Sequence, residues 1–357
     1  MEKKVVAILF GSVSSEYEVS LRSAASVLRN FPREEYDVVL LGITKDGRWY
    51  QFEGDADLIE RDRWLQEGRV TPAILNPDRS AGGLTRFTAG GPENVKIDLV
   101  FPVLHGEHGE DGTIQGLFEM AGLPYVGCGV LASATCMDKD VTHTLLEAAG
   151  IRTAPYVALA RPQLAELDAL EPDLREKLGY PMFVKPANTG SSVGVGKAKD
   201  AAGLRACLEA AFRYDRKVVV EQAILGHEVE CAVLGNYADA VASVVGEIVP
   251  HHEFYDYEGK YLDDSTDLYI PARIPEETAE AIRRTAVKAF AAMGCTGLAR
   301  VDFLIRKADG RVFLNEINTI PGFTSISMYP KLFEAAGLPY PKLIGRLLEL
   351  ALEKRSL

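Results

Sequence analysis

Residues 297–318, GLARVDFLIRKADGRVFLNEIN, are the most informative stretch of this sequence. Both ends of it are apolar runs typical of strands, and side chains two residues apart on a strand lie on the same face. Glu316 and Asn318 are therefore expected to point the same way, and Arg300 shares a face with Asp302. If the two runs pair, Asp302, Glu316 and Asn318 bring together three oxygen donors, which suits Mg²⁺ bound to nucleotide phosphates. The alternative is that all three are ordinary polar residues at strand ends.

Length and charge restrict the class of protein. With 357 residues and 47% hydrophobic side chains the chain can bury a sizeable core, and its length predicts two or three domains. Because 51 acidic residues outnumber 39 basic ones, the net charge is −12, and we expect no broad nucleic-acid surface. A local basic pocket for nucleotide phosphates is still compatible with this charge.

Targeting and cysteine patterns favour a cytoplasmic protein. The apolar run in MEKKVVAILFGS is only six residues long, so we interpret it as a first strand, not a signal peptide. No stretch approaches the ~20 apolar residues of a membrane helix, and we expect no membrane association. The five cysteines are scattered and lack a CxxC spacing, which indicates buried thiols and neither a zinc site nor a disulfide framework. They are Cys128, Cys136, Cys207, Cys231 and Cys295.

Strand and helix patterns alternate along the first part of the chain, as in an α/β protein with substantial parallel sheet. We expect residues 48–96, which are acidic and rich in glycine, to be an irregular excursion. The predicted strands are 4–10, 37–43, 97–103 and 124–126. The predicted helices are 20–29, with Leu21, Ala24, Ala25 and Leu28 on its buried face, and 113–121.

A further helix is predicted to begin at Asp138 and to end at Gly150, with Val141, Leu145 and Leu146 pointing inward. After it, a small separate lobe is predicted from strands 181–185 and 217–222, loop 187–196 and helix 200–212. The remaining elements are strands 229–235 and 242–249, loop 250–271, helix 277–293 and helix 341–353. The first of these two helices should bury Ile282, Ala286, Ala289 and Met293, and the second Leu343, Ile344, Leu347 and Leu350 or Ala351.

The segment FVKPANTGSSVGVGK, residues 183–197, is a strand that ends in Lys185 and continues into a glycine-rich loop. The glycines let the backbone approach phosphate oxygens, and the amides with Ser191 and Ser192 can donate to them. It is not a Walker A motif, because the lysine precedes the glycines. A hairpin without a ligand is the alternative.

In VVVEQAILGHEVE, residues 218–230, Glu221 and Gln222 end a strand and Glu228 follows seven residues after Glu221. Backbone groups of such a segment can bind an adenine edge, and a carboxylate can reach ribose hydroxyls. For this segment alone, charged residues facing solvent are the simpler interpretation.

The order of several motifs along the chain resembles that of the ATP-grasp ligases. These motifs are Lys139, Lys185, GSSVG, EQAI with Glu228, RVD and NEINTIPG. The chain is more specifically similar to the D-alanine:D-alanine ligase family in FGSVSSEYEVSLRSA, HGEHGEDGTIQG, CMDKD, FYDYEGKYLDDST and NTIPGFTSISMYP. The resemblance extends over residues 5 to 350. It implies an α/β, three-domain ATP-grasp fold: an N-terminal doubly wound parallel-sheet domain (1–135), a central lobe (136–226) and a C-terminal domain (227–357).

In that family, ATP phosphorylates the carboxylate of one D-alanine, and the amine of a second attacks the acyl phosphate, for peptidoglycan precursor synthesis. The resemblance therefore implies ATP, two Mg²⁺ or Mn²⁺ ions and a homodimer. The alternatives are a D-alanine:D-serine ligase, another ATP-grasp carboxylate-amine ligase, or a nucleotide-binding regulatory module without turnover.

The resemblance also implies roles for single residues. Glu16 resembles the carboxylate that holds the ammonium of the first D-alanine, and the alternative for it is an acid at a helix N-terminus. Val19 and His105 are similarly placed as first-substrate contacts, and His105 could equally be a structural turn histidine. Arg300 and the Gly322 amide resemble an oxyanion site. Ser327 and Met328 correspond to the second-substrate site.

The remaining roles concern the nucleotide and the closing loop. The residues implied to contact ATP are Lys139, Lys185, Ser192, Glu221, Gln222, Ile224, Glu228, Phe254, Lys260, Leu304 and Asn315, and the metal ligands are Asp302, Glu316 and Asn318. Ser191 and Tyr261 resemble the pair that, with Glu16, links the first domain to the closing loop. Tyr261 also favours an amine nucleophile over D-lactate. Ser12 and Tyr17 depart from the family pattern without removing a proposed chemical group.

Overall fold

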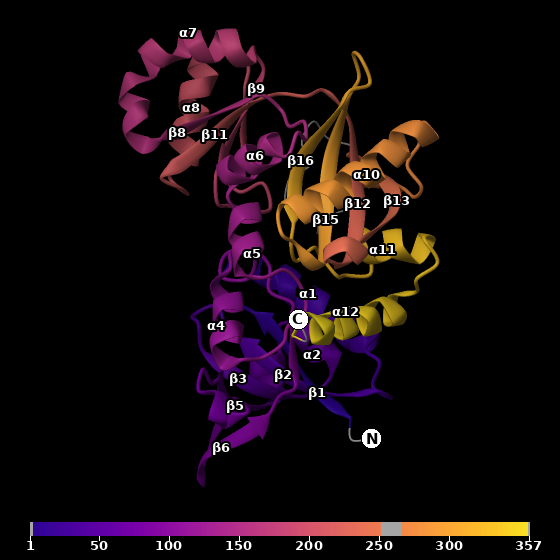
Figure 1. Cartoon of the computed structure of the whole chain (residues 1–357). Coiled ribbons are helices and arrows are strands. Elements are labelled where there is room, and N and C mark those ends of the chain that lie inside the picture. The colour runs from indigo at the N-terminus through magenta and orange to yellow at the C-terminus, as the bar shows by residue number, and fades with distance from the viewer. Residues whose placement is uncertain (1–2, 251–265, 356–357) are drawn as a thin grey trace.

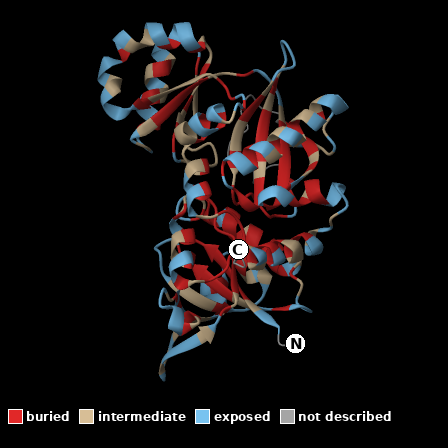
Figure 2. Cartoon of the chain, viewed as in Figure 1, coloured by how far each residue is buried: buried red, intermediate tan, exposed pale blue. Residues whose placement is uncertain are grey.

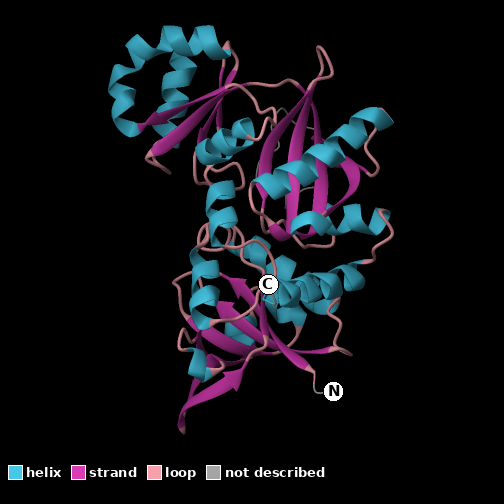
Figure 3. Ribbon diagram, viewed as in Figure 1, coloured by secondary structure: helices cyan, strands magenta, loops and turns pink. Residues whose placement is uncertain are grey.

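The computed structural model describes residues 3–250 and 266–355. Phe254, Lys260 and Tyr261 lie outside the described residues. Three separate β-sheets with flanking helices make up the described part (Figures 1 and 3), which confirms the α/β class. No helix in this part is long and apolar enough to cross a membrane.

The N-terminal sheet has seven strands in the order β6-β5-β4-β3-β2-β1-β7. Strand β1 (Lys4–Gly11), second from one edge of this sheet, pairs in parallel with β2 (Tyr36–Ile43) and with the edge strand β7 (Leu99–Pro102), as expected for a parallel core. The predicted strand at 124–126 is reduced to a single bridge between Tyr125 and Val100.

The prediction of an irregular excursion at residues 48–96 was wrong. This segment forms four antiparallel strands that extend the sheet, namely β3 (Trp49–Glu53), β4 (Arg69–Leu75), β5 (Gly83–Thr88) and β6 (Gly91–Lys96). Short helices α2 (Ala56–Glu60) and α3 (Trp64–Glu67) lie between β3 and β4. Several glycines lie in the turns or at the first residue of a strand: Gly82 precedes β5 with φ +75°, and Gly91 begins β6 with φ +112°, conformations that only glycine adopts easily.

The N-terminal sheet is packed on both faces. Helix α1 (Tyr17–Arg29) buries the four residues predicted to face the core. The C-terminal helix α12 (Tyr340–Arg355) joins the same hydrophobic core, and its Leu343 and Leu347 share that core with Ile8 and Phe10 of β1. Figure 1 shows α12 beside this sheet although they are at opposite ends of the chain. Helix α4 (Thr113–Ala121) packs in the other core of this domain.

Helices α5 (Val130–Met137) and α6 (Lys139–Ala148) connect the N-terminal sheet to the rest of the chain (Figure 1). The predicted start of α6 is confirmed, because the Asp138 carboxylate accepts from the amides of Asp140 and Val141. The prediction that Leu145 points inward was wrong: it is exposed, and the buried face consists of Thr142, His143 and Leu146. The buried face was assigned incorrectly because it includes a polar residue, His143, whereas the prediction counted only apolar residues.

The central lobe is a four-stranded antiparallel sheet in the order β10-β9-β11-β8. Its strands are β8 (Tyr156–Ala160), β9 (Met182–Pro186), β10 (Gly196–Ala198) and β11 (Lys217–Gln222). Helices α7 (Leu167–Leu178) and α8 (Ala201–Ala211) cover one face and bury Val184, Val218 and Val220. Lys185 and Glu221, one residue away from these valines, therefore point to the other face.

The C-terminal sheet has five antiparallel strands in the order β14-β13-β12-β15-β16. They are β12 (Gly226–Asn236), β13 (Val241–Pro250), β14 (Thr266–Tyr269), β15 (Thr296–Arg306) and β16 (Val312–Asn318). Helix α10 (Glu276–Ala292) covers one face and, with Met293, buries the residues predicted for it. The other face packs partly on α11 (Met328–Ala335). Figure 2 shows the buried residues concentrated in the sheets.

Candidate active site

The two runs that opened the sequence analysis do pair, as strands β15 and β16. Asp302 lies opposite Glu316, and Arg300 lies opposite Asn318, so the four side chains share one face. The neighbouring residues Val301, Phe303 and Ile305 point to the opposite face and pack in the core with α10. The predicted convergence of one amide and two carboxylates is therefore built by strand register alone.

Arg300 is held between two buried carboxylates. Its guanidinium donates to Asp302 from Nε (2.7 Å) and Nη2 (2.6 Å), and Nε lies 3.0 Å from Glu230 Oε2. Burial disfavours the charged guanidinium, but the two carboxylates raise the pKa of Arg300 well above its ordinary value. Sequence reasoning missed Glu230, which is opposite Asp302 on β12 and shares a face with Glu228. The alternation in HEVE was the signal for it.

The carboxylate and amide oxygens of Asp302, Glu316 and Asn318 are of the kind that hard cations such as Mg²⁺ prefer. Asn318 Nδ2 donates to Asp302 Oδ2 at 3.0 Å, so its amide oxygen is within the same group of atoms. Across residues 3–250 and 266–355, no cluster of three or more His, Cys, Asp or Glu side chains is arranged to hold a metal ion. A magnesium site here would therefore have to include the Asn318 amide together with Asp302 and Glu316.

Lys185 and Lys139 approach the site from the central lobe and from α6. Lys185 Nζ lies 2.6 Å from Glu221 Oε2 and 3.3 Å from Asn315 Oδ1, and Lys139 Nζ donates to the Thr189 carbonyl at 2.6 Å. Burial lowers the pKa of Lys139, which Glu316 only partly offsets. Burial acts in the same direction on Lys185, but Glu221 raises its pKa above the ordinary value.

The glycine-rich loop between β9 and β10 contacts the N-terminal domain. The Ser191 hydroxyl donates to the Glu16 carboxylate, and both Ser191 (φ +49°) and Ser192 (φ +59°) adopt left-handed backbone conformations. Glu16 is buried just before α1. The hydrogen bond between Glu16 and Ser191 therefore joins the N-terminal domain to the central lobe.

His105 is buried, and both of its ring nitrogens have protein partners. Nδ1 lies 3.0 Å from the Ile320 carbonyl, and Nε2 lies 3.0 Å from Ser23 Oγ. Glu110 Oε1 is 3.6 Å from Nδ1, and burial, together with the charge of Glu16, raises the pKa of Glu110. Sequence reasoning did not single out Glu110, although it belongs to the HGEHGEDG motif.

The turn after β16 places Gly322 against Ser327, which immediately precedes α11. A Cβ at position 322 would lie 2.8 Å from Ser327 Oγ, so a larger residue there would displace the Ser327 hydroxyl. Ser327 Oγ also accepts from the Thr324 amide at 3.0 Å. The two residues predicted for different substrate roles are thus in direct contact.

Most of these side chains line one cavity of about 920 Å³ between the three sheets. The predicted residues that line it are Glu16, His105, Lys139, Lys185, Ser191, Ser192, Glu221, Gln222, Ile224, Glu228, Arg300, Leu304, Asn315, Glu316, Asn318, Gly322, Ser327 and Met328. Among the described residues, two predicted ones do not line it: Val19 is buried in α1, and Asp302 lies behind Arg300 and Asn318. The lining also includes Glu110, Glu230 and Lys331, which were not predicted.

Comparison with known proteins places these features in one family. Residues 5–128 match the family described as D-ala D-ala ligase N-terminus, and residues 145–349 match D-ala D-ala ligase C-terminus. A protein of Acetivibrio thermocellus named D-alanine–D-alanine ligase is 51% identical over 99% of this chain and 97% of its own length. One from Thermoanaerobacter pseudethanolicus, with the same name, is 48% identical over 100% and 98%.

Two solved structures are also similar. The VanG D-Ala:D-Ser ligase of Enterococcus faecalis has a TM-score of 0.89 and 40% identity, and covers 98% of this chain and 100% of that one. The D-alanine-D-alanine ligase of Coxiella burnetii has a TM-score of 0.89 and 35% identity, with coverage of 100% and 96%. The fold expected from the resemblance is confirmed. The chain belongs to the D-alanine–D-alanine ligase family.

Proposed function

We propose that this protein ligates two D-alanines to D-alanyl-D-alanine, using ATP and forming a D-alanyl phosphate, for the synthesis of peptidoglycan precursors. The names of the curated relatives support the reaction. The observation that carries the proposal is the cavity in which Lys139, Lys185 and Arg300 lie near the carboxylate and amide of Glu316 and Asn318. Cations beside oxygen ligands of this kind suit a magnesium nucleotide.

The nucleotide would lie between the central lobe and the C-terminal sheet. Lys139, Lys185, Ser192 and Asn315 would contact its phosphates, and Glu228 its ribose. Ala154, Ile224 and Leu304 belong to a small apolar cluster that lines the cavity, which suits an adenine ring beside the Glu221–Gln222 segment. Two Mg²⁺ or Mn²⁺ ions would be held by Asp302, Glu316 and Asn318. The bound metal would neutralise the negative charge of the phosphates.

Glu16 would hold the ammonium of the first D-alanine, with Val19 and His105 nearby. Arg300 and the Gly322 amide would stabilise the oxyanion that develops in the tetrahedral intermediate. Ser327 and Met328 would contact the second substrate. Ser191 would keep Glu16 in place. The roles of Phe254 at adenine, Lys260 at phosphate and Tyr261 in the closing loop rest on sequence resemblance only.

The same proposal includes three domains, at residues 1–135, 136–226 and 227–357. It also includes a homodimer and a cytoplasmic location. The substrates are small molecules, as in an ATP-dependent ligase, and the net charge of −12 argues against a nucleic-acid partner.

Phosphate release with ATP, Mg²⁺ and a panel of amines and hydroxy acids tests the proposal. We expect release with D-alanine alone and D-alanyl-D-alanine as the product. The similarity to a D-Ala:D-Ser ligase makes D-serine with D-alanine the second mixture to analyse. If D-alanyl-D-serine were the main product, D-serine would replace D-alanine as the proposed second substrate. No D-alanine-dependent release from protein that binds ADP would reject turnover and favour a regulatory module.

A further inference from the structure

His143 is a buried polar residue to which the proposed mechanism gives no role. It lies one helical turn after Lys139 on α6 and is only 3% exposed. Its Nε2 lies 3.0 Å from Glu221 Oε1, and its ring stacks on Tyr156 with 4.2 Å between centroids. His143 thus lies behind Glu221, which lines the cavity where the nucleotide is proposed to bind.

The two oxygens of Glu221 have different partners. Oε1 faces His143, and Oε2 faces Lys185 at 2.6 Å. Burial raises the pKa of Glu221, but Lys185 and His143 more than offset it and bring the pKa to about 2. Since an ionised carboxylate only accepts, His143 Nε2 must carry the hydrogen. Nδ1 is buried, and no described residue offers it a hydrogen-bond partner.

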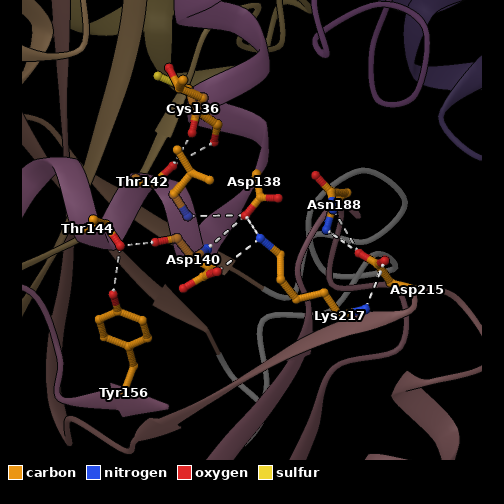
Figure 4. A network of polar contacts seen from close by, with 11 residues as sticks. Cys136, Asp138, Asp140, Thr142, Thr144, Tyr156, Asn188, Asp215 and Lys217 are labelled. Carbon is orange, nitrogen blue, oxygen red and sulfur yellow. Dashed lines mark hydrogen bonds and ion pairs between the residues drawn. The ribbon is translucent and has the colours of Figure 1, made fainter. Parts of the chain in front are cut away.

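The first turn of α6 is fixed to strand β11, which carries Glu221. Lys217 Nζ, at the start of β11, lies 2.7 Å from Asp138 Oδ1 and 3.0 Å from Asp140 Oδ2 (Figure 4). The Lys139 amide also donates to the Ala187 carbonyl at 3.0 Å, beyond β9. Helix and strand are thus tied together one turn from His143, so its donor has little freedom relative to Glu221.

We propose that His143 is a positioning residue, which orients the Glu221 carboxylate so that Lys185 stands where the nucleotide phosphates bind. The inference rests on the proposed function for the identity of the nucleotide. Without the His143 donor, Glu221 Oε1 loses a buried partner and the carboxylate can rotate about its terminal bond. Lys185 would follow the carboxylate, because its contact with Glu221 (2.6 Å) is shorter than its contact with Asn315 (3.3 Å).

A purely structural role would have His143 only pack against Tyr156. Two variants of the full chain separate the roles. His143→Phe keeps an aromatic ring on Tyr156 but removes the donor, and His143→Gln keeps a donor at the distance of Nε2 but removes the ring. Thr144→Val is the matched control on the same helix: it removes a hydroxyl that contacts the Tyr156 hydroxyl at 3.2 Å and leaves Glu221 untouched.

Calorimetric titration with MgADP, together with KM for ATP and for D-alanine, measures the effect. For His143→Phe we expect about tenfold weaker ADP binding and a similar rise in KM for ATP, equivalent to about 1.4 kcal/mol. The KM for D-alanine should stay within about twofold. His143→Gln should lose less than about threefold in ADP affinity, and Thr144→Val should bind ADP like the wild type.

Wild-type ADP affinity in His143→Phe would overturn the proposal. Equal losses in His143→Phe and His143→Gln would also overturn it, because they would assign the effect to packing. If His143→Phe does not fold, His143→Asn replaces it, since its shorter amide cannot reach Glu221. ADP affinity is measured without D-alanine, so a wild type that binds ADP but does not turn over would reject the proposed function and still decide this inference.

Discussion

Glu16 and Ser191 are hydrogen-bonded to each other although they are 175 residues apart in the sequence. The space around this contact is tight. A Cβ at Gly106 would lie 2.5 Å from Glu16 Oε2, and one at Gly190 would lie 2.8 Å from the same atom. One carboxylate is thus enclosed by the N-terminal domain and by the central lobe, and any bulk added there must move it.

Gly190→Ala should therefore impair catalysis without unfolding the protein. The added methyl group displaces the Glu16 carboxylate, and we expect kcat/KM for D-alanine to fall by about tenfold or more. Gly116→Ala is the matched control, because a Cβ there meets nothing within 4 Å on helix α4. It should raise the free energy of unfolding by about 0.5–1 kcal/mol and leave the kinetics unchanged. Unchanged kinetics in Gly190→Ala would show that Glu16 tolerates displacement.

Glu316→Ala should abolish turnover and leave the fold largely intact, because it removes an oxygen ligand from the proposed metal site. Thermal unfolding with ADP, in the presence and absence of Mg²⁺, checks this: the additional stabilisation by Mg²⁺ should disappear. Asp309→Asn, in the turn between the same two strands, should retain it, since within residues 3–250 and 266–355 the Asp309 side chain is hydrogen-bonded only to Arg306 and Arg311. Wild-type activity in Glu316→Ala would end the magnesium assignment.

Arg300→Met should destabilise the protein by about 3–5 kcal/mol, because Asp302 and Glu230 would be left buried without their cation. Urea unfolding measures the loss. Arg306→Met on the same strand removes an ion pair with Asp309 at the surface and should cost about 1 kcal/mol or less. Adding Glu230→Gln to Arg300→Met should recover part of the stability. Equal effects of the two single substitutions would contradict the buried charge network.

The pH dependence of stability should carry a contribution from Glu221. Its pKa falls from an ordinary value of 4.5 to about 2, so the folded state binds its proton less readily than the unfolded state. The stabilisation is complete above about pH 4.5 and is lost as the pH falls towards 2. The difference in unfolding free energy between wild type and Glu221→Gln should therefore shrink between pH 5 and pH 3. A difference that stays constant over this range would place the carboxylate outside the ion pair.

Much of the fold followed from local patterns. The start of α6 was correct because a capping carboxylate acts on amides two and three residues away, and the faces of α1 and α10 followed from helical periodicity. The four strands at 49–96 were missed because their glycines lie in tight turns and at strand starts, and composition alone does not distinguish such glycines from those of an irregular loop.

The candidate site divides in the same way. The convergence of Asp302, Glu316 and Asn318 on one face was correctly predicted, because they lie on two strands joined by a short turn, where alternation fixes the face. Glu230 was missed although strand alternation in HEVE places it on the face of Glu228. The contacts of Glu110 with His105 and of His143 with Glu221 were not predicted, because they join side chains whose proximity no spacing rule describes. For Phe254, Lys260 and Tyr261 the sequence remains the basis of the prediction.

The sequence by itself determined which strand or helix face carries the candidate residues for phosphate, metal and amino-acid binding, because backbone periodicity is a local property. Only the tertiary structure decided which charges neutralise one another. Glu221 belongs to Lys185 and His143, and Arg300 belongs to Asp302 and Glu230, because burial excludes water and leaves each ionised group dependent on partners from other strands and helices.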